Sequence, residues 1–297
     1  MSEIKLFELG NQVKERNSSN VALEKDLQTT IENNMEEFFG VRFLDTEFII
    51  ENGRIDSIGI DENNSPVIFE YKRRSSENVI TQGLFYLNKI LEHKEAFELL
   101  VLKKLGKEVS DNIDWSVPAV ICVARDFWNY DIEAVDQIGA NIKLVKYYKY
   151  GEDLLMFEHL NAPKVKPNYS GKEESGSSSN GQKTHVEKLK LLNDKIKELY
   201  DNVCNYIEAL GDDIVANQLK YYLAYKTIQN LICIEVYNTK IILRMKIDPK
   251  TVELEEGFTR DVSNLGHLGT GDFEVEIDSD EDFQKAKPLI DRAYEEA

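Results

Sequence analysis

The chain has 297 residues, of which 42% are hydrophobic, so it is long enough to form two domains with packed cores. Its formal net charge of −18 excludes a general basic field that would attract nucleic acid or an anionic membrane. No apolar run approaches the ~18 residues of a membrane span, and the charged start MSEIKLFELG lacks the apolar core of a signal peptide. We therefore expect a cytoplasmic protein with no membrane partner.

Residues 1–162 are expected to form the first domain. A helix is predicted between the capping residues Ser18, Ser19 and Asn20 and the stop signal Gly40. Asn52-Gly53 is typical of the tight turn of a β-hairpin. The elements run helix, three strands, helix, strand, helix, strand, which predicts an α/β fold, a mixed sheet flanked by helices. The expected strands are 41–50, 54–61, 66–72, 117–124 and 142–148, and the later helices are 77–104 and 131–138.

Residues 163–185 are rich in Ser, Gly, Lys and Pro and contain almost nothing to bury, which predicts a flexible linker. Residues 186–297 are expected to form a smaller α+β domain. Its predicted elements are a helix at 186–210, a short helix, strands near 230–237, 240–247 and 274–278, and a last helix at 280–295. The glycines of GHLGTGDFEVEID lack the lysine of a phosphate-binding loop, so we interpret them as a tight loop.

The cysteines and histidines are scattered and have no spacing typical of a metal site. We expect the cysteines to be small buried side chains in a reducing compartment, and the histidines to lie on the surface or in the linker. These residues are Cys122, Cys204, Cys233, His93, His159, His185 and His267.

The stretch VIFEYKRR carries charge at the end of a predicted strand. Because side chains alternate along a strand, Glu70 and Lys72 share one face, and Asp56 points to one face of the preceding strand. If the two strands form a hairpin centred near Asn63, Asp56 falls opposite Glu70, with Cβ atoms ~5 Å apart. Two carboxylates that close need a cation between them, either the lysine or a hard divalent metal ion such as Mg²⁺.

These residues carry a resemblance to a known family. The pattern of Asp56, Glu70 and Lys72 resembles the PD-(D/E)xK nuclease superfamily, with Ile55 in place of the proline of the family name. Gln82 and Tyr86, one helical turn apart, resemble the QxxxY motif of the RecB-like branch, and Glu24 corresponds to the glutamate of the first helix. The N-terminal half also resembles the nuclease domain of NucS-type endonucleases, whose core has the predicted element order.

The resemblance implies a catalytic set consisting of Glu24, Asp56, Glu70, Lys72, Gln82 and Tyr86. Asp56, Glu70 and the main-chain carbonyl of Tyr71 would hold Mg²⁺ or Mn²⁺, and Glu24 would reach the same ion or a second one. Lys72 would position the attacking water or stabilise the developing charge on the phosphate. Gln82 would orient the lysine or touch the phosphate, and Tyr86 would support this site.

Positive side chains near the predicted site are candidates for binding nucleic acid. Arg73 and Arg74 follow the lysine, and one of the two is expected to face away. The tract KLVKYYKY places Lys143, Lys146 and Lys149 among tyrosines, a mixture typical of single-strand binding. The alternative, which the pattern favours, is an edge strand protected by lysines.

The second domain, especially LGTGDFEVEIDSDEDFQKAKPLIDRAYE, resembles an uncharacterised domain. That domain occurs at the C-termini of some GmrSD-type modification-dependent restriction enzymes and of proteins loosely labelled "predicted transport protein". Nothing spans a membrane, so we do not expect a transporter. The association with restriction enzymes favours a role with DNA, in restriction, defence or repair.

The leading hypothesis is therefore a Mg²⁺- or Mn²⁺-dependent endonuclease that acts on DNA in preference to RNA. A homodimer or a protein partner is compatible with the sequence. Two alternatives remain open: a nucleic-acid-binding or regulatory protein on an inactive nuclease fold, and an interaction protein with no nucleic-acid role. Read alone, Glu70 and Lys72 would be a surface ion pair worth less than ~1 kcal/mol.

Overall fold

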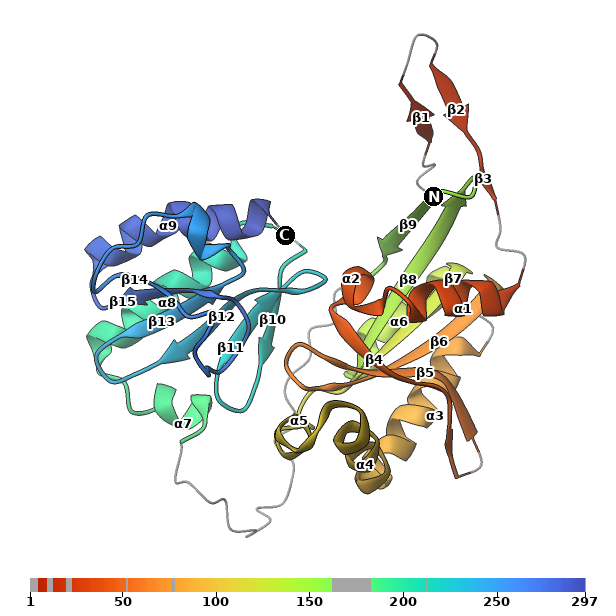
Figure 1. Cartoon of the computed structure of the whole chain (residues 1–297), viewed down its shortest axis with the longest axis horizontal. Coiled ribbons are helices and arrows are strands. Elements are labelled where there is room, and N and C mark those ends of the chain that lie inside the picture. The colour runs from red at the N-terminus through yellow and green to blue at the C-terminus, as the bar shows by residue number, and fades with distance from the viewer. Residues whose placement is uncertain are drawn as a thin grey trace.

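The computed structural model describes residues 5–9, 13–19, 23–51, 53–75, 78–161, 183–211 and 213–296. Within these ranges the chain forms two domains, each built on its own sheet (Figure 1). Most of the predicted linker 163–185 lies outside the described residues, because 162–182 are not among them. None of the helices in the described ranges combines the length and the apolar character needed to cross a bilayer.

The first domain has the predicted α/β architecture, a mixed sheet flanked by helices. Its strand order is β3-β8-β7-β6-β5-β4, with β9 beside β8. The pairs β4–β5 and β5–β6 are antiparallel, whereas β6–β7 and β7–β8 are parallel. The strands are β3 (Ser18–Ser19), β4 (Val41–Ile50), β5 (Gly53–Asp61), β6 (Pro66–Ser75), β7 (Ala119–Asp126), β8 (Asn141–Tyr150) and β9 (Leu154–His159).

Helices cover both faces of this sheet. The apolar residues of α1 and α2 pack with Phe69 and Tyr71 on one face, and those of α3, α4 and α6 pack with Ile58 and Ile68 on the other. We call these the α1 face and the α3 face. The helices are α1 (Glu24–Glu32), α2 (Met35–Phe39), α3 (Val79–Glu92), α4 (Lys94–Leu105), α5 (Lys107–Asp111) and α6 (Asn129–Ile138).

Two predicted helices are each interrupted. The first breaks at Asn33 and Asn34 and ends, as expected, at Gly40, whose φ of 63° is the left-handed conformation that glycine adopts without strain. The helix expected at 77–104 breaks at His93. Its first part lies very close to the sheet, because a Cβ on Gly83 would sit 2.4 Å from Cγ1 of Val120. This contact places the first turn of α3 directly over β7.

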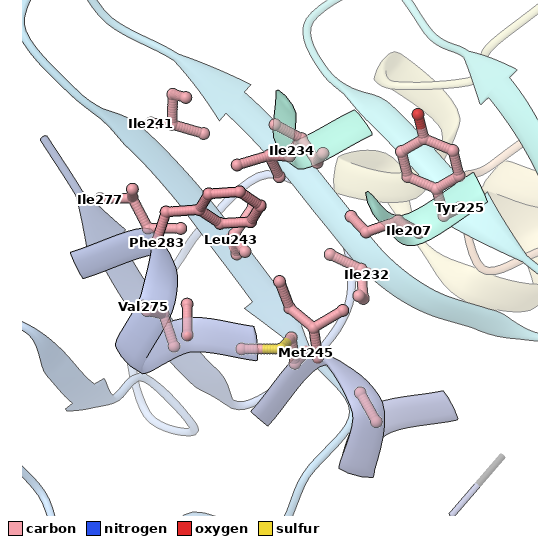
Figure 2. Close-up of a cluster of buried hydrophobic side chains, with 14 of the residues drawn as sticks. Ile207, Tyr225, Ile232, Ile234, Ile241, Leu243, Met245, Val275, Ile277 and Phe283 are labelled. Carbon is pink, nitrogen blue, oxygen red and sulfur yellow. The ribbon is translucent and has the colours of Figure 1, made fainter. Parts of the chain in front are cut away.

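The second domain is a six-stranded sheet of order β10-β11-β12-β13-β15-β14 with helices on one face. Figure 2 shows its core, in which Leu243 and Val275 of the sheet and Phe283 of α9 lie together. The strands are β10 (Val215–Gln218), β11 (Leu223–Lys226), β12 (Asn230–Val236), β13 (Ile241–Met245), β14 (Thr259–Asp261) and β15 (Phe273–Ile277). The helices are α7 (His185–Leu189), α8 (Asp194–Glu208), η1 (Pro249–Thr251) and α9 (Asp280–Glu295).

Several sequence predictions for this domain need correction. The short helix expected after Gly211 is absent from the described residues, which form the antiparallel strands β10 and β11 there. The helix expected at 186–210 is divided into α7 and α8. His185, assigned to the linker or surface, is fully buried, and its Nε2 lies 3.2 Å from the Tyr200 hydroxyl. Cys122 and Cys233 are buried free thiols as expected, and Cys204 is half-buried.

The N-terminal segment contains strands that the sequence did not predict. β1 (Leu6–Glu8) and β2 (Lys14–Arg16) form a separate two-stranded sheet, which projects from the first domain in Figure 1. Their three-residue length and mixed charges give a weak strand signal, so local sequence provides little basis for predicting them.

The turn between β5 and β6 contacts the second domain. Asn63 is 5% exposed, and its side chain bonds to the amide of Asn230 and to the hydroxyl of Tyr222. Asp61 accepts hydrogen bonds from the main-chain N–H groups of Asn63 and Ser65, which fixes the turn. The second domain therefore holds the end of the hairpin whose strands carry Asp56 and Glu70.

Candidate active site

Asp56 and Glu70 lie on adjacent antiparallel strands. β5 and β6 pair Ser57 with Phe69 and Ile58 with Ile68, so the predicted register, centred on Asn63, is confirmed. The main-chain N–H of Asp56 donates to Oε1 of Glu70 at 3.4 Å, and the N–H of Tyr71 donates to Oδ2 of Asp56 at 3.1 Å. Each carboxylate is therefore held by the backbone of the opposite strand, and the two acidic side chains lie together on the α3 face.

The two carboxyl groups share a desolvated environment. Glu70 is only 2% exposed, and burial followed by the negative charge of Asp56 raises its pKa to about 8. Burial also raises the pKa of Asp56, while the hydrogen bond from Tyr71 and the charge of Lys72 act in the opposite direction. Two adjacent, partly desolvated acids that disfavour simultaneous ionisation either share a proton or bind a cation.

Lys72 follows Glu70 on the same face of β6. In the parallel sheet Lys72 pairs with Ala124 of β7, and Ala124 pairs with Lys146 of β8. Because neighbouring strands are ~4.8 Å apart, the Cα atoms of the two lysines are about 10 Å apart, in one row across the sheet. Nζ of Lys146 also bonds to the carboxylate of Asp126 at 2.7 Å. The α3 face thus carries two carboxylates with a short row of positive charge beside them.

Glu24 reaches the same end of the sheet from α1. Its Oε2 accepts a hydrogen bond of 2.9 Å from the main-chain N–H of Arg73. Its negative charge is one of the smaller causes that raise the pKa of Asp56, after burial. The carbonyl of Arg73 in turn accepts a hydrogen bond from the Tyr147 hydroxyl at 2.9 Å. The end of β6 is therefore fixed from two sides, with a third carboxylate near the first two.

Gln82 and Tyr86 lie on α3 in different surroundings. Oε1 of Gln82 is buried and has no hydrogen-bond partner among the described residues. The Tyr86 hydroxyl accepts from the N–H of Arg54 at 3.4 Å, and its ring lies against Gly53. Tyr86 therefore supports the start of β5, the strand that carries Asp56.

The remaining positive candidates are dispersed. Arg73 is half-buried with an unpartnered Nε, and the side chain of Arg74 lies outside the described residues. Lys143 and Lys149 alternate with Lys146 and so point to the α1 face; Lys149 bonds to Glu152 at 2.7 Å. Burial and the nearby charge of Lys226 lower the pKa of Lys143 to about 7. Of the three lysines in KLVKYYKY, only Lys146 shares the face of the carboxylates.

The favoured alternative for that tract is wrong, because β8 is not an edge strand. It pairs with β7 on one side and with β9 on the other. The sequence reasoning missed β9 because the strand LLMFEH is short and has no clear alternation.

A second group of metal-ligating side chains lies outside this site. Glu51, Glu92 and His93 approach one another at the surface. Nζ of Lys89 lies 2.8 Å from Glu51 and 2.7 Å from Glu92, so a lysine ammonium already bridges the two carboxylates where an ion would sit. We assign no metal to this group.

Gln28 is a site residue that the sequence reasoning missed. It is 6% exposed, and its Nε2 donates to the main-chain carbonyl of Asp56 at 2.7 Å and to Glu32 at 2.8 Å. Ser57 also donates to Glu32, at 2.6 Å. The sequence did contain a signal for Gln28. Glu24, Gln28 and Glu32 recur every four residues and so lie on one side of α1.

Replacing Gln28 with alanine is expected to lower the free energy of unfolding by about 1–3 kcal/mol, because it removes the side-chain donor to the Asp56 carbonyl and one of the two donors to Glu32. Chemical denaturation of the purified protein measures this loss. The adjacent exposed Thr29 provides the control, and Thr29→Ala should change stability by less than ~0.5 kcal/mol. Equal stability of the two variants would contradict the assigned contact.

Comparison with known proteins shows a relative that matches nearly the whole chain. A Haemophilus influenzae protein, named only as "Uncharacterized protein", is 31% identical over 282 residues, which is 92% of this chain and 93% of the relative. The chain therefore belongs to the same family as the Haemophilus influenzae protein. Because the match spans nearly the whole length of both, the family includes both domains and the segment between them. Residues 183–297 also match a family model described as "Domain of unknown function (DUF5655)".

Three solved structures show distant likeness, each below 20% identity. A "repair endonuclease from Pyrococcus abyssi" is 19% identical, with a TM-score of 0.28 over 43% of this chain and 49% of that one. The "EndoMS-dsDNA2 complex" is 16% identical, with a TM-score of 0.26 over 48% and 64%. "Pyrococcus Furiosus SfsA in complex with Ca2+" is 12% identical, with a TM-score of 0.27 over 52% and 74%. The chain thus spans less than two thirds of the first two.

Proposed function

We propose that this protein is a divalent-metal-dependent nuclease that hydrolyses phosphodiester bonds, with DNA as the preferred substrate. The observation that carries the proposal is the convergence of Asp56 and Glu70 next to Lys72 on one face of the sheet. This arrangement differs from a surface ion pair, because Glu70 is almost completely buried. A buried carboxylate beside a half-buried one is costly for stability, so we infer that the pair is retained for function.

The donor set fits Mg²⁺ or Mn²⁺. Hard cations prefer carboxylate and carbonyl oxygens, and two carboxylates with water and phosphate oxygens are a common set. Asp56 and Glu70 would hold the ion together with the main-chain carbonyl of Tyr71, and Glu24 approaches the same region. A bound ion would supply positive charge that polarises the phosphodiester and lowers the pKa of a coordinated water.

The protein's own groups would then bind and orient the substrate. Lys72 would donate a hydrogen bond to a non-bridging phosphate oxygen, or hold the attacking water in line, and would offset negative charge that develops in the transition state. The buried amide of Gln82 would orient the lysine or contact the same phosphate. Lys146 would hold a neighbouring phosphate as the strand leaves the site, whereas Arg73 alternates with Lys72 and so lies on the α1 face.

The acidic surface restricts how DNA is engaged. With a net charge of −18, binding by general phosphate attraction is weak, so we propose that the enzyme requires a particular DNA form, such as an end or a modified base, or a partner protein. A homodimer would also meet this need. The second domain, which holds the β5–β6 turn, would take part in this recognition. The role that we propose for such an enzyme is restriction, defence or repair.

The proposal is tested by incubating the purified chain with single-stranded, duplex and branched DNA and with RNA, in Mg²⁺ or Mn²⁺. We expect cleavage of at least one DNA form, and Asp56→Asn should reduce it by about a thousandfold or more because the metal loses a charged ligand. Asp201→Asn, at an exposed position on α8, is the control and should cleave like the wild type. Binding of DNA without cleavage by the wild type would instead support the inactive nuclease fold.

A further inference from the structure

Two large aromatic side chains are exposed at the edge of the sheet where β6 and β7 end. Trp128 is 56% exposed and Tyr130 is 79% exposed. They follow β7 directly, at the start of α6. The other tryptophan, Trp115, instead packs edge-on against Phe97 in the core of this domain. Exposed tryptophan is uncommon on a surface that has no partner.

The topology places these rings near Lys72. β6 and β7 are parallel, so their carboxyl ends meet at one edge of the sheet, where ligands bind in open α/β sheets. Lys72 pairs with Ala124, and Trp128 is four residues further along, at most ~14 Å of extended chain. α3, which carries Gln82, and α6 both begin at this edge. The rings therefore lie at the same edge of the sheet as Lys72.

The backbone beneath the rings is well anchored. Phe127, immediately before Trp128, is 4% exposed and packs in the core of the α3 face. The N–H of Trp128 donates to the carboxylate of Asp131 in the first turn of α6, at 3.4 Å. A fixed backbone with outward aromatic side chains forms a surface on which a planar group can stack at low cost in conformational entropy.

Positive side chains accompany the rings. Lys146, at the end of the row that begins with Lys72, bonds to Asp126, two residues before Trp128. Arg125, also in this segment, lies 5.4 Å from the centre of the Tyr148 ring and donates to Ser18. Proteins that bind single-stranded nucleic acid combine cationic side chains, which contact phosphates, with aromatic rings, which stack on bases.

We propose that Trp128 and Tyr130 stack on unpaired bases of a single DNA strand that lies across the carboxylate site. The inference rests on the proposed nuclease function and deepens it, because it assigns unpaired nucleotides as the substrate class. Stacking also fits the charge of the chain. A protein of net charge −18 gains little from counterion release, whereas base stacking needs no positive surface.

The test is fluorescence anisotropy with labelled oligo-dT, in EDTA so that no cleavage occurs. Trp128→Leu and Tyr130→Ala should each weaken binding by about tenfold, whereas Trp128→Phe, which retains a ring, should bind within about threefold of the wild type. Ile138→Ala changes another exposed apolar side chain, 41% exposed at the far end of α6, and is the control. Fully paired duplex should bind more weakly than oligo-dT, and labelled oligo-rU should show whether the sugar matters.

The outcomes separate this inference from the proposed function. Equal oligo-dT affinity in Trp128→Leu, Tyr130→Ala and the wild type would overturn the stacking site, even if Mn²⁺-dependent cleavage is found. Absence of oligo-dT binding by the wild type would also overturn it. Weakened binding in both variants, with no cleavage of any substrate by the wild type, would support the stacking site and contradict the nuclease. Loss of binding in Ile138→Ala as well would contradict a local role for the rings.

Discussion

Replacing Lys72 with alanine is expected to lower the rate of metal-dependent DNA cleavage by about a hundredfold or more, while metal binding is kept. The lysine stands beside Asp56 and Glu70 and attracts both carboxylates, but its ammonium group cannot be a ligand. Removing it takes away a positive charge that would stabilise the transition state, an effect of about a hundred- to a thousandfold for one donor. Single-turnover cleavage and Mn²⁺ titration measure the two effects separately.

The metal titration tests this prediction most directly. Because like charges repel, Mn²⁺ should bind Lys72→Ala as tightly as the wild type or more tightly. Lys103→Ala, at an exposed position on α4, is the matched control and should change neither quantity. Cleavage at the wild-type rate by Lys72→Ala would show that this lysine has no part in the reaction.

Replacing Glu70 with glutamine is expected to stabilise the metal-free protein at high pH and to abolish metal binding. The pKa of Glu70 is raised from its ordinary value near 4.5 to about 8, first by burial and then by the charge of Asp56. Between these values the folded state binds more protons than the unfolded state, so stability falls as pH rises from about 4.5 to about 8. Glutamine, which stays neutral, avoids this loss.

Chemical denaturation in EDTA tests the sign of the effect. At pH 5 the two proteins should be about equally stable, and at pH 9 Glu70→Gln should be more stable by about 2 kcal/mol or more. The exposed Glu133 supplies the control, because Glu133→Gln should leave the pH profile of the wild type unchanged. A wild type whose stability rises between pH 5 and pH 8 relative to Glu70→Gln would contradict the assigned environment of Glu70.

The same raised pKa links metal binding to pH in the wild type. A cation must displace the proton held by the two acids, so Mn²⁺ affinity should fall below about pH 8. Glu70→Gln should lose both the affinity and this pH dependence. The variant thus separates the stability cost of the buried carboxylate from its use as a ligand.

Local patterns in the sequence were sufficient for most of the first domain. Gly40 ends the first helical region because glycine adopts the left-handed conformation without strain, a property of the residue itself that can be read from the sequence. The register of the β5–β6 hairpin followed from counting residues on either side of Asn63, since a short turn leaves the strands few ways to pair. Where the sequence failed, the signals were weaker, as for the short strands β9, β10 and β11.

The sequence by itself determined which residues could form the site: Asp56 opposite Glu70, with Lys72 on the same face. Strand alternation and hairpin register are local properties, so they can be read from the chain. Only the tertiary structure decided that Glu70 is buried, that Gln28 holds the backbone of Asp56 from another element, and that Lys146 rather than Lys143 shares the carboxylate face. These facts depend on which strands and helices pack together, because burial and through-space charge arise between segments far apart in the chain.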